Sequence, residues 1–106
     1  MVDDKVINIV KDYLRKLEIK GLHISKAYLY GSQAKGNATK DSDIDLMLVS
    51  PLFDDNTDSY AALIWFSASE VSYKIEPITV GEKKFQSDEY SPLIGIVKKE
   101  GIEIAA

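Results

Sequence analysis

The sequence has no cysteine and a single histidine, His23, among its 106 residues. Disulfides and thiolate metal sites are therefore excluded, and so is any metal site built from several imidazoles. We expect His23, which stands just before an apolar segment, to be structural or exposed. A hard cation such as Mg²⁺, held by carboxylate oxygens, is the metal chemistry that this composition leaves.

Long apolar runs are also missing. The apolar segments are far shorter than a membrane-spanning helix, and Asp3 and Asp4 lie where a signal peptide carries positive charge. We therefore expect a cytoplasmic protein with no membrane partner. The net charge is −4, from 17 acidic and 13 basic side chains, which argues against non-specific binding to nucleic acid.

The length predicts one domain, residues 1–106, without room for a second core. The chain is 45% apolar and 28% charged, as is usual for a folded soluble protein. A chain of this size forms no deep two-lobed cleft, so a large substrate must meet an open face or a second chain. The sequence does not decide whether the protein forms a homo-oligomer.

Apolar periodicity and turn residues predict the order of elements. We expect an amphipathic helix over 3–18, capped by Asp3 or Asp4 and ended by Gly21, and a long helix over 58–70, capped by Asp58. Pro77 leaves the N–H side of the third strand unpaired. The fold class is α/β (α+β), a small mixed sheet with helices mainly on one face. The expected helices span 3–18, 58–70 and 92–99, with a short helix through Lys35 after a tight turn at Gly31 and Ser32. The expected strands span 24–30, 43–49, 73–80 and 102–104, and a loop carries Phe85 and Tyr90.

The aromatic residues are expected to pack rather than to bind ligands. Trp65 and Phe66 lie on the helix expected over 58–70, where such side chains more often belong to the core than form a platform for a nucleobase. Tyr28 and Tyr30 should pack within the faces of the first strand.

Three aspartates stand at the entrance of the strand over 43–49. Because residues two apart in a strand point to the same side, Asp43 and Asp45 should project together, about 6–7 Å apart, with Ile44 and Leu46 facing the core. Such a pair suits Mg²⁺, with Mn²⁺ as the alternative. A solvated turn is the other interpretation of acidic residues here, and we assign it to Asp41.

A second feature precedes the aspartates. Gly31 lets a phosphate approach the backbone closely, and Ser32 can donate both its N–H and its hydroxyl. Lys35 and Lys40 are cations near enough to reach a triphosphate. A phosphate cradle one strand away from a carboxylate pair is typical of metal-assisted phosphoryl or nucleotidyl transfer.

The stretch GSQAKGNATKDSDIDL, residues 31–46, resembles the signature of the DNA polymerase β-like nucleotidyltransferase superfamily. The greatest similarity is to the minimal nucleotidyltransferases of bacteria and archaea. The Gly-Ser pair, a second glycine and the Asp-x-Asp motif followed by an apolar residue are all in register; the matching residues are Gly31, Ser32, Gly36, Ser42, Asp43, Asp45 and Leu46. The resemblance implies a nucleotidyltransferase fold and assigns Gly31, Ser32, Lys35 and Ser42 to nucleotide binding.

The resemblance also implies a third carboxylate on a neighbouring strand, which completes the metal site and serves as base. Glu76 is the best candidate, although most members of the superfamily have aspartate there, and Glu70 is a poorer one. The mechanism implied has two Mg²⁺ ions on Asp43, Asp45 and Glu76. An acceptor hydroxyl attacks the α-phosphorus of a nucleoside triphosphate, with ATP expected, and pyrophosphate leaves.

The sequence does not identify the acceptor. Minimal members of the superfamily are often encoded beside a HEPN-type partner in toxin–antitoxin pairs, and this pairing is implied by the resemblance alone. The rival hypothesis is a catalytically weak or inactive module that binds a nucleotide or a partner. Modification of aminoglycosides would need an acceptor pocket that so short a chain cannot build alone.

Overall fold

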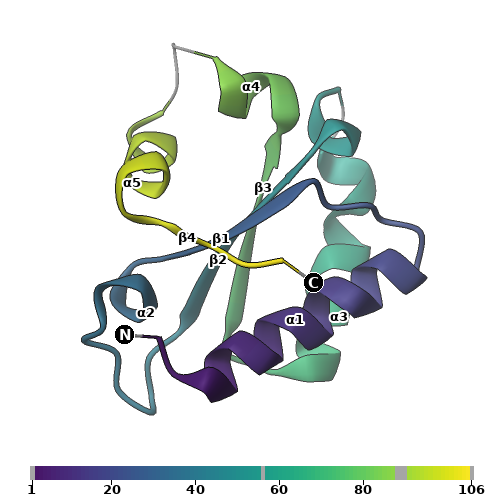
Figure 1. The fold of residues 1–106 in the computed structure, drawn as a ribbon. Coiled ribbons are helices and arrows are strands. Elements are labelled where there is room, and N and C mark those ends of the chain that lie inside the picture. The colour runs from purple at the N-terminus through teal and green to yellow at the C-terminus, as the bar shows by residue number, and fades with distance from the viewer. Residues whose placement is uncertain (1, 56, 88–90, 106) are drawn as a thin grey trace.

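The computed structural model describes residues 2–55, 57–87 and 91–105, so that Tyr90 lies outside the described residues (Figure 1). No helix in these ranges is long and apolar enough to cross a membrane. The elements, in chain order, are α1 (Asp4–Ile19), β1 (Lys26–Tyr30), α2 (Ser32–Lys35), β2 (Ile44–Ser50), η1 (Pro51–Phe53), η2 (Thr57–Tyr60), α3 (Ala61–Val71), β3 (Ile75–Gly81), α4 (Glu82–Gln86), α5 (Pro92–Glu100) and β4 (Ile102–Glu103).

The four strands form one mixed sheet in the order β3-β2-β1-β4. Strand β1 is antiparallel to both β2 and β4, whereas β2 and β3 run parallel. The connection between the parallel strands passes through α3, the usual arrangement for a parallel pair. Strand β3 is an edge strand, as Pro77 predicts, because proline cannot donate to a ladder.

The two long helices, α1 and α3, pack on one face of the sheet, as predicted (Figure 1). Helix α1 begins where expected, with the Asp3 carboxylate accepting from the backbone N–H of Lys5. Its apolar stripe enters the core together with the inward residues of β1 and β2. The fully buried side chains of this layer include Val10, Tyr13, Leu17, Leu29, Ile44, Leu46, Leu48 and Ile64.

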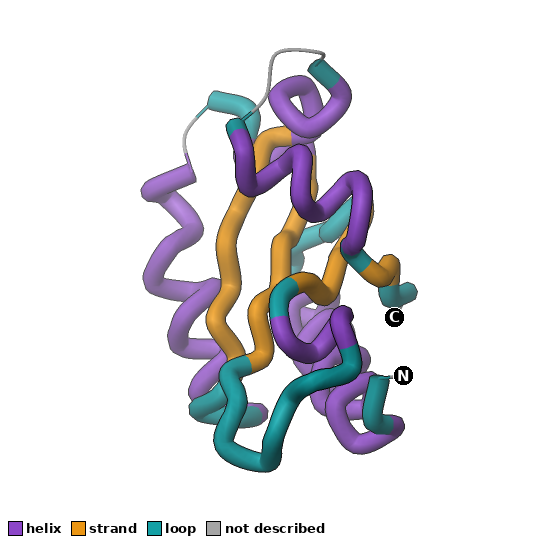
Figure 2. Tube along the Cα trace, turned by 90° about the vertical axis from the view of Figure 1, so that its left-hand side faces the viewer, coloured by secondary structure: helices purple, strands orange, loops and turns teal. Residues whose placement is uncertain are grey.

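Helices α4 and α5 lie over the opposite face of the sheet (Figure 2). A second, smaller apolar cluster lies under them. It joins Tyr30, Met47, Val49 and Val80 of the sheet to Phe85, Ile94 and Val97 of the two helices. Tyr28 stacks on Phe85, so both tyrosines of β1 pack as predicted, but Phe85 is helical rather than in a loop. These helices leave the starts of β2 and β3 uncovered on this face, where Glu76 is exposed.

Two expectations for the helix over 58–70, which is α3 in the structure, were wrong. Helix α3 begins at Ala61 after Tyr60, with no side-chain cap, and Asp58 belongs to the preceding η2. Trp65 and Phe66 are 52% and 62% exposed, because the inward positions of α3 are Ile64, Ser67 and Ala68. A strongly apolar helix has no clear polar face in its sequence, so the pattern does not show which side turns inward.

Tyr13 provides a test of the contact between α1 and α3. Its buried hydroxyl donates to the carbonyl of Ile64 over 2.9 Å. We expect Tyr13→Phe to lower the free energy of unfolding by about 1 kcal/mol, measured by urea titration, because a buried hydrogen bond is lost without a cavity. Tyr73→Phe is the matched control, since Tyr73 is 86% exposed. Equal effects of the two changes would contradict a stabilising Tyr13 hydrogen bond.

Candidate active site

Asp43 and Asp45 project from the uncovered face at the start of β2. Their neighbours Ile44 and Leu46 are buried in the core on the other face, which confirms the predicted alternation. Asp43 is exposed and Asp45 is half-buried. Partial burial, and then the charge of Asp43, raise the pKa of Asp45 above its usual range. The pair is therefore a small, uncompensated negative site.

Asp45 stands in the middle of a row that crosses three strands. In the strand register it is opposite Tyr30 of β1 and beside Glu76 of β3. Burial, and then the charges of Asp45 and Glu76, raise the pKa of Tyr30 to about 12. The phenol is therefore protonated near neutral pH and able to donate a hydrogen bond. From the sequence, Tyr30 was expected only to pack; its place directly before Gly31 was the available signal.

Gly31 connects β1 to α2 and comes very close to Asp45. Its φ of 71° lies in the left-handed region that favours glycine. A β-carbon on Gly31 would lie 2.6 Å from Oδ2 of Asp45, closer than real contacts allow. The turn therefore places the backbone of Gly31 against the carboxylate of Asp45. Helix α2 follows over Ser32–Lys35 as expected, but four residues give little helix dipole.

The turn before Asp43 is held by its own side chains. The Ser42 hydroxyl accepts from the backbone N–H of Thr39 over 2.9 Å, and the Thr39 hydroxyl accepts from the N–H of Asp41. Asp41 thus lies in a turn, as expected. The Ser42 hydroxyl is thus engaged in the turn directly before Asp43. Its contact with a phosphate remains a prediction, as does that of the exposed Lys35.

The carboxylates fit a hard cation in part. Mg²⁺ is commonly held by one or two carboxylates together with substrate phosphates, and Asp43 and Asp45 provide that pair. Glu76 lies on the adjacent strand, but within the described ranges no three Asp, Glu, His or Cys side chains are gathered to hold a metal ion. Glu70 does not join this group, because its carboxylate accepts from Lys20 over 2.5 Å and forms an ion pair with Lys16.

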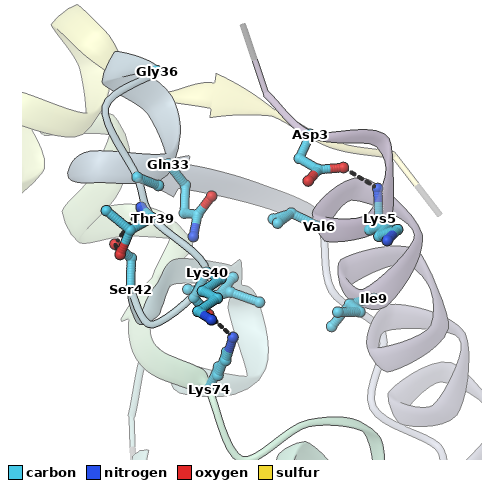
Figure 3. Close-up of a pocket in the computed structure, with 12 residues that line it drawn as sticks. Asp3, Lys5, Val6, Ile9, Gln33, Gly36, Thr39, Lys40, Ser42 and Lys74 are labelled. Carbon is cyan, nitrogen blue, oxygen red and sulfur yellow. Dashed lines mark hydrogen bonds between the residues drawn. The ribbon is translucent and has the colours of Figure 1, made fainter.

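A pocket of about 380 Å³ lies behind the carboxylates, between α1 and the loop after α2 (Figure 3). Ser42 and Ile44 line it, whereas Asp43 and Asp45 point to the other face of the sheet. The side chain of Gln33, only 6% exposed, connects the two regions: it lines the pocket, and its amide nitrogen lies 3.3 Å from the carbonyl oxygen of Asp43. Gln33 was not among the predicted site residues, because its neighbours in the sequence give no signal of this contact.

Replacing Gly31 tests its approach to Asp45. We expect Gly31→Ala to lower the free energy of unfolding by about 2–3 kcal/mol, from the strained backbone and the clash with Oδ2. Gly21→Ala is the matched control, because Gly21 also has a positive φ, 91°, but nothing lies within 4 Å of its added β-carbon. Adding Asp45→Ala to Gly31→Ala should restore part of the loss. If both glycine changes were equally destabilising, the contact with Asp45 would not matter.

Comparison with known proteins gives a matching family and several solved structures of similar fold. Residues 5–104 match the model of the nucleotidyltransferase domain. The fold resembles the crystal structure of a proposed nucleotidyltransferase from Sulfolobus solfataricus, with a TM-score of 0.63 and 15% sequence identity. The match covers 93% of this chain and 78% of that one. No curated protein matches the sequence.

The family match spans nearly the whole chain, including the Gly31–Ser32 turn and the carboxylate pair beside it. Members of the family generally use divalent metal ions, which agrees with a pair of carboxylates facing outward. The structural neighbour shares the fold, and at this low identity it shows nothing more. The chain belongs to the nucleotidyltransferase domain family.

Proposed function

We propose that this nucleotidyltransferase moves a nucleoside monophosphate, AMP from ATP in the leading case, to a hydroxyl acceptor. The observation that supports the proposal most is the close approach of Gly31 to Asp45, which sets the Gly31–Ser32 turn against one of the two outward carboxylates. Neither feature alone indicates this chemistry. Together, on adjacent strands, they put the groups that bind phosphate next to those that hold a cation.

Each residue then has a role. The backbone of Gly31 and the N–H and hydroxyl of Ser32 bind phosphate oxygens, with Lys35 as a nearby cation. Asp43 and Asp45 would hold the divalent ion, which when bound neutralises the charge of the triphosphate and of the leaving pyrophosphate. Positioning and charge neutralisation supply most of the rate in such reactions.

Glu76 is proposed as the base. The acceptor oxygen forms a bond to the α-phosphorus while the bond from that phosphorus to the bridging oxygen breaks. Pyrophosphate leaves with the electron pair, and the Glu76 carboxylate takes the hydroxyl proton. Its exposure and its position beside Asp45 in the strand register support this role.

The acceptor is proposed to lie on a second protein. The uncovered end of the sheet is open rather than enclosed, since Asp43 and Glu76 are exposed. A protein hydroxyl brought by a partner, with a HEPN-type protein as the candidate, suits such an open face. The same openness fits the rival function, a module that binds a nucleotide or a partner without catalysis, and the absence of a ready three-carboxylate group among the described residues favours it.

Transfer of label from ATP carrying ³²P at its α-phosphate tests the proposal. With Mg²⁺ and the product of the neighbouring gene, we expect label on that protein. Asp43→Asn or Asp45→Asn should reduce transfer by about 10³-fold, and Glu76→Gln by about 10²-fold through kcat with little change in KM. Glu70→Gln, which removes a carboxylate of the α1–α3 contact, should transfer normally.

Two outcomes would contradict catalysis. Stabilisation by Mg²⁺ and ATP without label on protein, RNA or small hydroxyl compounds would favour the binding module. Transfer that survives Asp45→Asn would place the chemistry elsewhere.

A further inference from the structure

The pocket behind the carboxylates holds none of the residues given a role in the proposed transfer, although Ser42, a predicted phosphate contact, also lines it. Its composition is unusual for this chain. Three lysines, Lys5, Lys40 and Lys74, line it with a single carboxylate, that of Asp3. The chain as a whole carries a net charge of −4. Three lysines from three separate segments therefore border one hollow of an acidic protein, which favours an anionic ligand there.

One of the three positive charges, that of Lys74, is held in place. Lys74 is half-buried, and its ammonium group donates to the backbone carbonyl of Lys40, which ties the loop after α2 to the start of β3 (Figure 3). The Asp3 carboxylate is already used to cap α1. Asp3, the one acidic residue that lines the pocket, is thus engaged in the cap of α1. The lysine ammonium groups keep donors available for a ligand.

The other residues that line the pocket suit an apolar part and a hydrogen-bonding group of such a ligand. Val6 and Ile9 point from α1 towards the loop that carries Lys40 (Figure 3). Together with Ile44 they make an apolar wall. The Gln33 amide nitrogen donates to Asp43, and no described residue donates to its amide oxygen, which leaves this acceptor for a hydroxyl or amino group. The volume of about 380 Å³ is within the range of small-molecule sites.

We propose that this pocket binds a phosphorylated small molecule, with its phosphate on Lys5 and Lys74 and its apolar part against Val6 and Ile9. This site is distinct from the carboxylate pair, because β2 separates the two and they open on opposite faces of the sheet. A bound ligand contacts Gln33, which donates to the backbone of Asp43. The inference does not depend on the proposed transfer reaction.

Binding of AMP to the metal-free protein tests the proposal. In EDTA, Asp43 and Asp45 repel an anion, so calorimetric titration reports the pocket. We expect AMP to bind at one site and inorganic phosphate more weakly, because phosphate has no apolar part. Lys5→Gln/Lys74→Gln should weaken AMP binding by about tenfold or more, since two charge-assisted contacts are lost.

Three control variants separate this pocket from binding elsewhere on the protein. Lys83→Gln/Lys84→Gln removes the same charge from exposed positions on α4 and should leave AMP binding unchanged. Asp43→Asn/Asp45→Asn should not weaken it either. Lys5→Gln alone keeps the Lys74–Lys40 contact and should still weaken AMP binding. A loss in this variant therefore cannot come from displacement of the loop that carries Lys40. Absence of AMP binding, or equal losses in the pocket and α4 variants, would overturn the proposal.

Discussion

Gly31 and Asp45 lie so close that no β-carbon fits between them, and the rest of the candidate site depends on this contact. Together with the φ of 71° it favours glycine directly after β1, and Ser32 follows in the same turn. It also requires the antiparallel register that sets Tyr30 opposite Asp45. The parallel pairing of β2 with β3 then adds Glu76 to the same row. One close approach thus belongs to an arrangement that brings together Gly31, the carboxylate pair and Glu76, the residues proposed to bind phosphate, hold a cation and take a proton.

The same arrangement is unfavourable for the protein without ligands. The raised pKa of Asp45 means that its ionised form is disfavoured in the fold, through partial burial and then the charge of Asp43. Because the folded state holds this proton more tightly, stability falls as pH rises from the ordinary carboxyl range through the raised pKa. A cation at the pair would reverse this effect. Gln33 donates to the backbone of Asp43, and Ser42 accepts from the backbone of Thr39, so the chain's own hydrogen bonds support the turn before β2.

Most of the fold could be predicted, because α1, β2 and α5 each have a clear period and clear end signals: Asp3, the apolar run after Asp45, and Pro92 before Gly101. The motif likewise placed the Gly-Ser turn and the carboxylate pair. The orientation of α3 could not be predicted, since its apolar residues surround the helix and tertiary packing selects Ile64 rather than Trp65. The pocket behind the site was also unpredictable. It joins α1, the loop and the residue before β3, which are remote in sequence.

The most direct test is thermal unfolding of Asp45→Asn beside the wild type, with and without Mg²⁺ and ATP. Asp41→Asn, a change in the adjacent turn, is the control. Without ligands, Asp45→Asn should be more stable than the wild type by up to about 1 kcal/mol, a limit set by solvent screening of a half-buried charge. With Mg²⁺ and ATP, the wild type and Asp41→Asn should gain stability and overtake Asp45→Asn. A ligand-free Asp45→Asn protein no more stable than the wild type, or an equal gain from Mg²⁺ and ATP, would contradict a carboxylate pair built to hold a cation and a nucleotide.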